Sequence, residues 1–135
     1  MFHDVFGHTP LLSNKDYALF FESMGKLAVK YMHQKEIILM LQRLYWFTIE
    51  FGLIKENGTT KIFGAGIISS KEETKHAIGN NSIKTDFDMD KIMKHDFRTD
   101  ILQNEYYVID SFEQLIQSLK KFETELEKEM IASSI

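Results

Sequence analysis

The chain has 135 residues, 44% of them hydrophobic, and a net charge of −4 at neutral pH. This length and composition predict a folded domain, one at most, and the negative charge disfavours a nucleic-acid or anionic-membrane surface. No stretch approaches the ~20 apolar residues of a membrane-spanning helix, and residues 1–12 do not resemble a signal peptide, so we expect a cytoplasmic location. The sequence has no cysteine, so a metal site would have to use histidine and carboxylate ligands.

The first half of the sequence predicts two long helices. Ser13 and Asp16 have the spacing of a capping box, and apolar residues follow at helical spacing to about Gln34. A second helix is predicted from Lys35 to Phe51, which Gly52 would end. This helix is apolar on nearly all sides, so we expect most of its faces to be buried.

The middle of the sequence predicts a hairpin and a short helix. The segments 51–55 and 60–63 flank Asn57-Gly58, a strong signal for a two-residue turn. Ser70 and Glu73 have the spacing of a helix cap, and Gly79 would end that helix. The expected fold class is therefore mainly α with a short β-hairpin.

The last part of the sequence is mostly polar up to residue 104. Residues 80–104 predict irregular structure with one helical turn near Met89–Lys94, and residues 106–109 predict a brief strand. Ser111 is expected to cap a final amphipathic helix that ends near Met130. Residues 131–135 are expected to fray.

Three side chains form a candidate metal site, namely His3, His8 and Glu50. On a continuous helix the two histidines would point roughly 140° apart, so they can face one ion only if the helix ends between them, and Gly7 could end it. Glu50 closes an otherwise apolar helix, where a carboxylate must be paired, protonated or metal-bound. Two histidines and one carboxylate form the facial triad of non-haem Fe(II) oxygenases.

Plainer explanations exist for each of these features. The histidine pair could lie on the surface, and Glu50 could reach water from the helix end. The aromatic run 45–47 is more often part of a core than of a binding site. His33, His76 and His95 have polar neighbours in the sequence, and we expect them to be solvated.

Four segments resemble the biopterin-dependent aromatic amino acid hydroxylases, in the same order along the chain. They are Phe2–Leu12, Leu44–Leu53, Phe63–Ser70 and Tyr106–Phe112. The residues around the first histidine and those of the last segment are most similar to the bacterial phenylalanine 4-hydroxylases. The resemblance implies a fold equivalent to the C-terminal half of the family's catalytic domain.

The resemblance also implies a function, which is the Fe(II)- and tetrahydropterin-dependent hydroxylation of an aromatic amino acid by O2, most simply phenylalanine to tyrosine. Nucleic acid and membrane are not expected as partners. The implied roles by residue are iron ligands at His3, His8 and Glu50; substrate contacts at Trp46, Phe51, Gly66 and Ser69; and pterin contacts at Tyr45 and Asp4. The Ser69 hydroxyl would support the first histidine ligand.

The sequence departs from the family pattern at several places. Gln42 stands where the family has alanine near the pterin, and Glu72 stands where it has glycine. Family members carry a long segment ahead of the first histidine ligand, which here follows only two residues. We therefore expect residues 1–130 to be a partial catalytic domain, a fragment that is inactive by itself.

Two other functions stay open. The chain could be an inactive metal-binding remnant of such an enzyme. It could also be a hydrolytic zinc enzyme that uses the histidine pair, although the apolar surroundings of Glu50 and the lack of a zinc motif with histidines at i and i+4 disfavour this.

Overall fold

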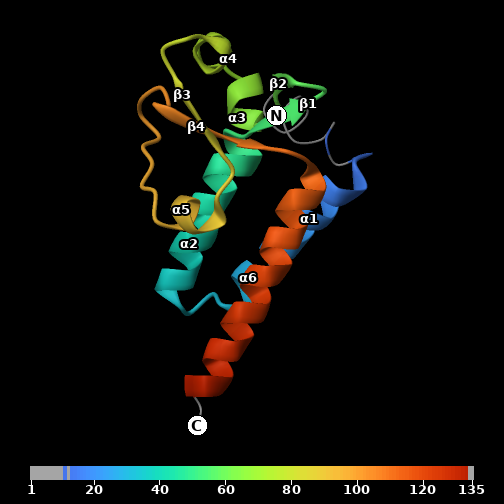
Figure 1. Ribbon diagram of the computed structural model, residues 1–135. Coiled ribbons are helices and arrows are strands. Elements are labelled where there is room, and N and C mark those ends of the chain that lie inside the picture. The colour runs from blue at the N-terminus through green and yellow to red at the C-terminus, as the bar shows by residue number, and fades with distance from the viewer. Residues whose placement is uncertain (1–10, 12, 134–135) are drawn as a thin grey trace.

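The computed structural model describes residue 11 and residues 13–133. The predicted helical turn at residues 1–8 lies outside the described residues, and so do His3, Asp4 and His8. Figure 1 shows a small sheet with short helices at one end of the molecule, from which the longer helices extend. None of the helices among the described residues combines the length and apolar character needed to cross a bilayer.

Helix α1 (Lys15–Lys30) begins at Asn14, whose side chain accepts a hydrogen bond of 3.0 Å from the Tyr17 backbone N–H. The prediction of Ser13 as the cap is therefore wrong by one position, and the helix ends four residues before Gln34. Asn and Ser are almost equally good caps, which is why the sequence does not separate them. The buried face of α1 packs against α6 (Phe112–Ser133).

The second predicted helix is present but changes type along its length. It runs as helix α2 (Lys35–Tyr45) and continues as the π-helical segment η3 (Trp46–Glu50). The Phe51 N–H donates to the Trp46 carbonyl five residues back at 2.9 Å, and Gly52 follows as predicted. Burial on most faces is confirmed for η3, where the consecutive residues Phe47, Thr48 and Ile49 are all buried, but not for α2, where Leu39 is 43% exposed. The fully buried residues of α2 lie on one side of the helix, and Ile38 and Met40 pack partly against the core.

The predicted hairpin is confirmed. Strands β1 (Leu53–Glu56) and β2 (Thr59–Ile62) pair antiparallel. The turn residues Asn57 and Gly58 have φ of 53° and 78°, the left-handed pair that a type I′ turn requires. The sequence therefore fixes both the register and the turn of this hairpin.

The hairpin belongs to a larger sheet than predicted, of order β2-β1-β4-β3. Strand β4 (Glu105–Ile109) pairs parallel with β1 and with β3 (Ile83–Asp86). The prediction of irregular structure is wrong at β3, an edge strand that has no buried residue and so no apolar alternation to reveal it. The fold is mainly helical with a four-stranded mixed sheet.

The remaining helices match the predictions closely, with one exception. Ser70 caps α4 (Lys71–Ile78) by accepting from the Glu73 N–H at 3.2 Å, and Gly79 ends it. Helix α3 (Ala65–Ile68), which was not predicted, precedes α4, and α5 (Met89–Met93) forms the predicted turn. Ser111 accepts from the Gln114 N–H at 3.1 Å at the start of α6, which ends at Ser133 instead of near Met130.

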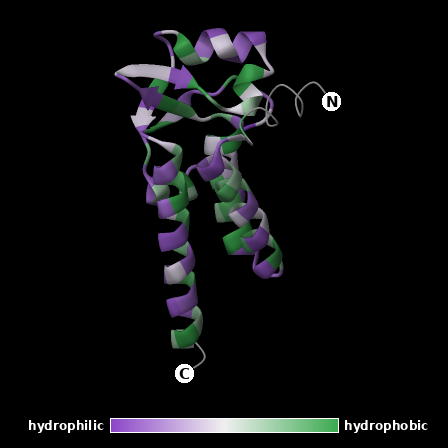
Figure 2. Cartoon of the chain, turned by 90° about the vertical axis from the view of Figure 1, so that its right-hand side faces the viewer, coloured by the Kyte–Doolittle hydropathy of each residue, from purple (hydrophilic) through white to green (hydrophobic). Residues whose placement is uncertain are grey.

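Helix α6 is the long amphipathic helix that the sequence predicts. Its buried residues, Leu115, Ile116, Leu119 and Leu126, face α1 and the core, whereas Met130 and Ile131 near its end are exposed. Figure 2 shows the corresponding bands of hydrophilic and hydrophobic residues along the helix. The packed part of α6 therefore extends from its start to Leu126.

Two glycines allow the end of η3 to lie against the turn that leads into α3. The Gly64 N–H donates to the Gly52 carbonyl at 2.9 Å. A Cβ atom at Gly64 would lie 2.5 Å from the Glu50 carbonyl oxygen and 2.5 Å from the Gly52 nitrogen. These are backbone atoms of a packed segment, so they cannot move aside cheaply.

We therefore predict that Gly64→Ala lowers the free energy of unfolding by about 3 kcal/mol, the upper range for overpacking. The matched control is Gly25→Ala in α1, where a Cβ atom meets nothing within 4 Å. Alanine there should stabilise the helix by about 0.5–1 kcal/mol. Urea unfolding followed by circular dichroism measures both changes. Equal stability of the two variants would contradict the close backbone packing.

Candidate active site

The π-helical segment η3 places several predicted site residues side by side. The Trp46 and Phe51 rings lie 4.5 Å apart between centroids. A Cβ atom at Gly66 would lie 2.8 Å from the tip of the Phe51 ring and 3.0 Å from the Glu50 carbonyl oxygen. Three of the four predicted substrate residues, Trp46, Phe51 and Gly66, thus gather around the end of η3. The fourth, Ser69, caps the C-terminus of α3 three residues after Gly66.

The indole of Trp46 is held on its edge and on its face. Its Nε1–H donates to the Gln103 side-chain oxygen at 3.0 Å. Its ring stacks on Phe97, with centroids 4.6 Å apart and planes 14° apart. Phe97 and Gln103 come from the segment between α5 and β4, which the sequence gives no reason to connect with Trp46. Nothing in the local pattern of residues 94–104 could have revealed either contact.

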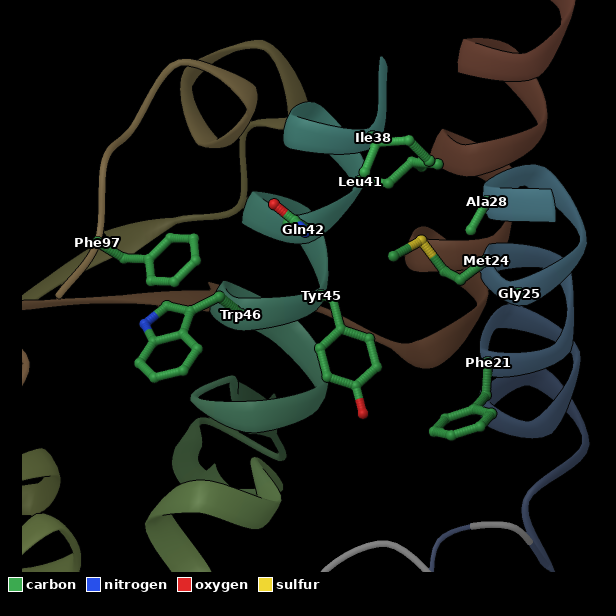
Figure 3. Close-up of a pocket in the computed structure, with 10 residues that line it drawn as sticks. All are labelled: Phe21, Met24, Gly25, Ala28, Ile38, Leu41, Gln42, Tyr45, Trp46 and Phe97. Atoms are coloured by element: carbon green, nitrogen blue, oxygen red, sulfur yellow. The ribbon is translucent and has the colours of Figure 1, made fainter. Parts of the chain in front are cut away.

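An apolar cavity of about 610 Å³ lies between α1 and α2. Figure 3 shows Trp46 and Phe97 on one side of it, Phe21 and Met24 of α1 on the other, and Tyr45 of α2 between them. Tyr45 is the predicted pterin contact, and Gln42, the departure from the family pattern, also lines the cavity. Trp46 therefore borders the cavity and also contacts the Phe51 ring.

Tyr17 lies close to this site from the α1 side. Its side chain is fully buried, and its hydroxyl has no hydrogen-bond partner in the described part of the chain. Burial raises the pKa of Tyr17 above its ordinary value, and the nearby Tyr45 and Glu50 raise the pKa further. The side chains of Glu50 and Tyr45 are thus near enough to Tyr17 to influence its ionisation.

Of the predicted metal ligands, only Glu50 belongs to the described residues. It is half-buried and ends η3. Within residue 11 and residues 13–133, no three His, Cys, Asp or Glu side chains lie together in a way that could hold a metal ion. The His3–His8–Glu50 triad and the Asp4 contact therefore stay predictions.

The expected solvation of the other histidines is right for one of three. His33 is exposed, but His76 and His95 are half-buried. His76 Nε2 lies 2.7 Å from the Gln103 carbonyl oxygen, and His95 Nδ1 lies 2.7 Å from the Tyr107 hydroxyl. The prediction that His76 and His95 are solvated rested on their polar sequence neighbours. Their burial instead comes from packing between segments far apart in the chain.

The family model for biopterin-dependent aromatic amino acid hydroxylases matches residues 1–133. The chain belongs to this family. It is 43% identical over 120 residues to phenylalanine-4-hydroxylase of Ralstonia nicotianae, and the matched region is 88% of this chain and 38% of that protein. It is 44% identical over 119 residues to the Chromobacterium violaceum enzyme of the same name, and the matched region is 87% of this chain and 40% of that protein. The expected likeness to bacterial phenylalanine 4-hydroxylases is confirmed.

The fold agrees with that of solved family members. A structure of C. violaceum phenylalanine hydroxylase bound to cobalt superposes with a TM-score of 0.81 at 44% identity, over 87% of this chain and 42% of that chain. A more distant relative is tyrosine 3-monooxygenase of the dog, 32% identical over 126 residues, or 93% of this chain and 25% of that protein. The chain thus spans well under half the length of these relatives.

Three buried tyrosines should make the protein sensitive to alkaline pH. Burial raises the pKa of Tyr107 to about 12, with Glu105 and Asp88 adding to the shift. Burial also raises the pKa of Tyr17 and Tyr106 above their ordinary value, and the Tyr106 hydroxyl donates to Glu73 at 2.5 Å. In the folded protein these groups keep their protons above pH ~10, where the unfolded chain loses them.

We therefore predict constant stability below pH ~10 and a loss of at most about 1.4 kcal/mol per pH unit for each of the three tyrosines above it. Urea unfolding from pH 8 to 11.5 measures the slope, and absorbance at 295 nm counts the ionised tyrosines. Tyr107→Phe is the informative variant, because it should reduce the slope. A stability that does not change across this range would contradict the prediction.

Proposed function

We propose that the chain forms part of the catalytic domain of an Fe(II)- and tetrahydropterin-dependent monooxygenase that hydroxylates the ring of an aromatic amino acid, phenylalanine to tyrosine. The observation that carries this proposal is the gathering of Trp46, Phe51 and Gly66 around the Glu50 end of a π-helical segment. Segments of this type occur often at functional sites. Because the chain belongs to the biopterin-dependent aromatic amino acid hydroxylases, we interpret this geometry as part of a hydroxylation site.

Glu50 would hold the metal together with His3 and His8. The donor set fits an iron ion, because histidine and carboxylate without thiolate suit non-haem Fe(II) and leave positions open for other ligands. A cation beside Glu50 would also offset the cost of placing a carboxylate among buried aromatic residues. A solved relative of this fold, the C. violaceum phenylalanine hydroxylase, binds cobalt. When bound, the iron would supply the oxidising chemistry with O2.

The aromatic residues beside Glu50 would bind the substrate ring. Trp46 and Phe51 present large apolar faces, which favour a flat aromatic side chain and keep water away from it. Gly66 has no side chain, so the Phe51 ring can lie close to the backbone there and take its place beside Trp46. Ser69 would orient His3 through its hydroxyl, because ligand histidines need a partner for the second ring nitrogen.

The cavity between α1 and α2 would receive the pterin. Its volume of about 610 Å³ lies within the range of about 300–1,000 Å³ typical of small-molecule sites. Tyr45 offers an aromatic ring for stacking, and the Gln42 amide offers both a donor and an acceptor to a heterocycle. Asp4 would contact the pterin from the segment that also carries His3.

The work of these residues is to bind and orient. Trp46 and Phe51 hold the substrate ring in a dry place beside the metal, and Tyr45 and Gln42 hold the pterin in the adjacent cavity. Trp46 lies between the two regions, since it lines the cavity and contacts Phe51. Such positioning makes the reaction of bound groups effectively intramolecular.

The test is metal binding and turnover by the purified chain. Glu50→Ala should weaken Co(II) binding more than about 100-fold, since a lost ligand exceeds the 10–100-fold typical of a lost ligand support. Visible absorption of Co(II) measures the affinity, and tyrosine formation from phenylalanine, Fe(II), tetrahydropterin and O2 measures activity. The matched control is Glu56→Ala in the hairpin, which removes an exposed carboxylate.

Equal Co(II) affinity of the Glu50→Ala and Glu56→Ala variants would contradict the assignment of Glu50. Metal binding through Glu50 without any tyrosine formation would favour the alternative of an inactive metal-binding remnant. Tyrosine formation that requires Glu50 would support the proposed monooxygenase and would show that the expectation of an inactive fragment is wrong.

A further inference from the structure

A buried polar network lies behind Trp46. Its centre is Gln103, which is only 6% exposed although it belongs to a mostly exposed polar segment, residues 94–104. Both its backbone groups and both its side-chain groups have partners. They are Glu73 Oε1 at 3.2 Å from its N–H, His76 Nε2 at 2.7 Å from its carbonyl oxygen, the Arg98 carbonyl at 2.9 Å from its Nε2, and Trp46 Nε1 at 3.0 Å from its Oε1.

Helix α4 holds Gln103 from one side. Glu73 and His76 are one turn apart on α4, and they bind the backbone N–H and the carbonyl of Gln103. Glu73 is itself 7% exposed, and its second carboxylate oxygen accepts from the Tyr106 hydroxyl at 2.5 Å. The Gln103 backbone is thus fixed between α4 and the central strand β4, and its side chain has little freedom to turn.

The same segment also supplies the ring that stacks on Trp46. Phe97 lies on one face of the indole at 4.6 Å, while Phe51 lies 4.5 Å from its centroid. A stacked ring restrains the tilt of an indole but leaves it free to slide and rotate in its plane. The hydrogen bond from Nε1 to Gln103 removes this remaining freedom, because it fixes one point on the edge of the ring.

We propose that Gln103 is a positioning residue that fixes the Trp46 indole as a wall of the amino acid pocket, with Glu73 and His76 holding Gln103 in place. The proposal rests on the proposed function, which places the substrate ring beside Trp46. Loss of the Gln103 acceptor leaves the indole N–H without its partner and lets the wall move. Phenylalanine binding should then weaken, even though no atom that touches the substrate has been removed.

The unaltered chain offers a first test, because Trp46 is its single tryptophan. An NMR spectrum of ¹⁵N-labelled protein has one indole N–H signal, which belongs to Trp46. A hydrogen-bonded, shielded N–H should exchange with water roughly 10-fold or more slowly than in a free peptide. An exchange rate equal to that of the free peptide would overturn the proposal without any mutation.

The second test compares Gln103→Met with Gln117→Met. Both substitutions replace an amide by a thioether of similar length, but Gln117 is exposed on α6. In the Gln103 variant the Trp46 indole should exchange faster, and acrylamide should quench its fluorescence more strongly. The Gln117 variant should keep both properties of the unaltered chain. Unchanged exchange and quenching in a folded Gln103→Met protein would overturn the proposal.

The third measurement links the indole to the substrate. With Co(II) in place of iron, L-phenylalanine binding to Gln103→Met should weaken roughly 3- to 10-fold, the effect of one lost hydrogen bond, and stay unchanged in Gln117→Met. If the indole of Gln103→Met is loosened but its affinity for phenylalanine equals that of the unaltered chain, the proposed role of Gln103 is overturned. The proposed function would not be affected by that result. No phenylalanine binding by the unaltered chain would contradict the proposed function itself, and the role of Gln103 at a substrate wall would fail with it.

Discussion

The site depends on one close backbone contact, between the end of η3 and the turn at Gly64. Because Gly64 has no side chain, its backbone lies directly against the Glu50 carbonyl and the Gly52 nitrogen. This contact sets where the last turn of the helix stops and where α3 begins. Gly66 on α3 then meets the Phe51 ring, so the predicted metal ligand and the predicted substrate wall are placed by the same packing.

The π-helical turn determines which side chains meet at the end of the helix. In η3 the chain makes i→i+5 hydrogen bonds, which insert one extra residue into the turn relative to an α-helix. Trp46 and Phe51 are five residues apart and yet lie in ring contact. On a regular helix they would point roughly 140° apart. The widened turn therefore brings both aromatic rings to one side, next to Glu50.

Local signals in the sequence predicted most elements, and long-range packing explains what they missed. The Asn57-Gly58 turn and the caps at Ser70 and Ser111 carry their information within a few residues, and all three are confirmed. Strand β3 has no such signal, because it is exposed and owes its existence to pairing with β4. For the site, the aromatic segment around Trp46 was recognisable by resemblance, whereas Gln103 is 57 residues away and belongs to a polar segment.

Glu73 and Glu50 are two carboxylates near the same pocket, and their surroundings suit different roles, structural for Glu73 and, as proposed, metal binding for Glu50. The rule that singled out Glu50, that a carboxylate among apolar residues needs a partner, applies equally to Glu73. Glu73 looks like a surface residue in the sequence, yet it is buried and accepts hydrogen bonds from Tyr106 and the Gln103 backbone. Its oxygens are engaged by protein donors, so it stabilises the fold and, through Gln103, orients Trp46. Glu50 is half-buried at the end of η3, its backbone lies against Gly64 and Gly66, and we propose that it binds the metal there. As proposed, the buried Glu73 thus holds the wall of the pocket, and the half-buried Glu50 holds its metal.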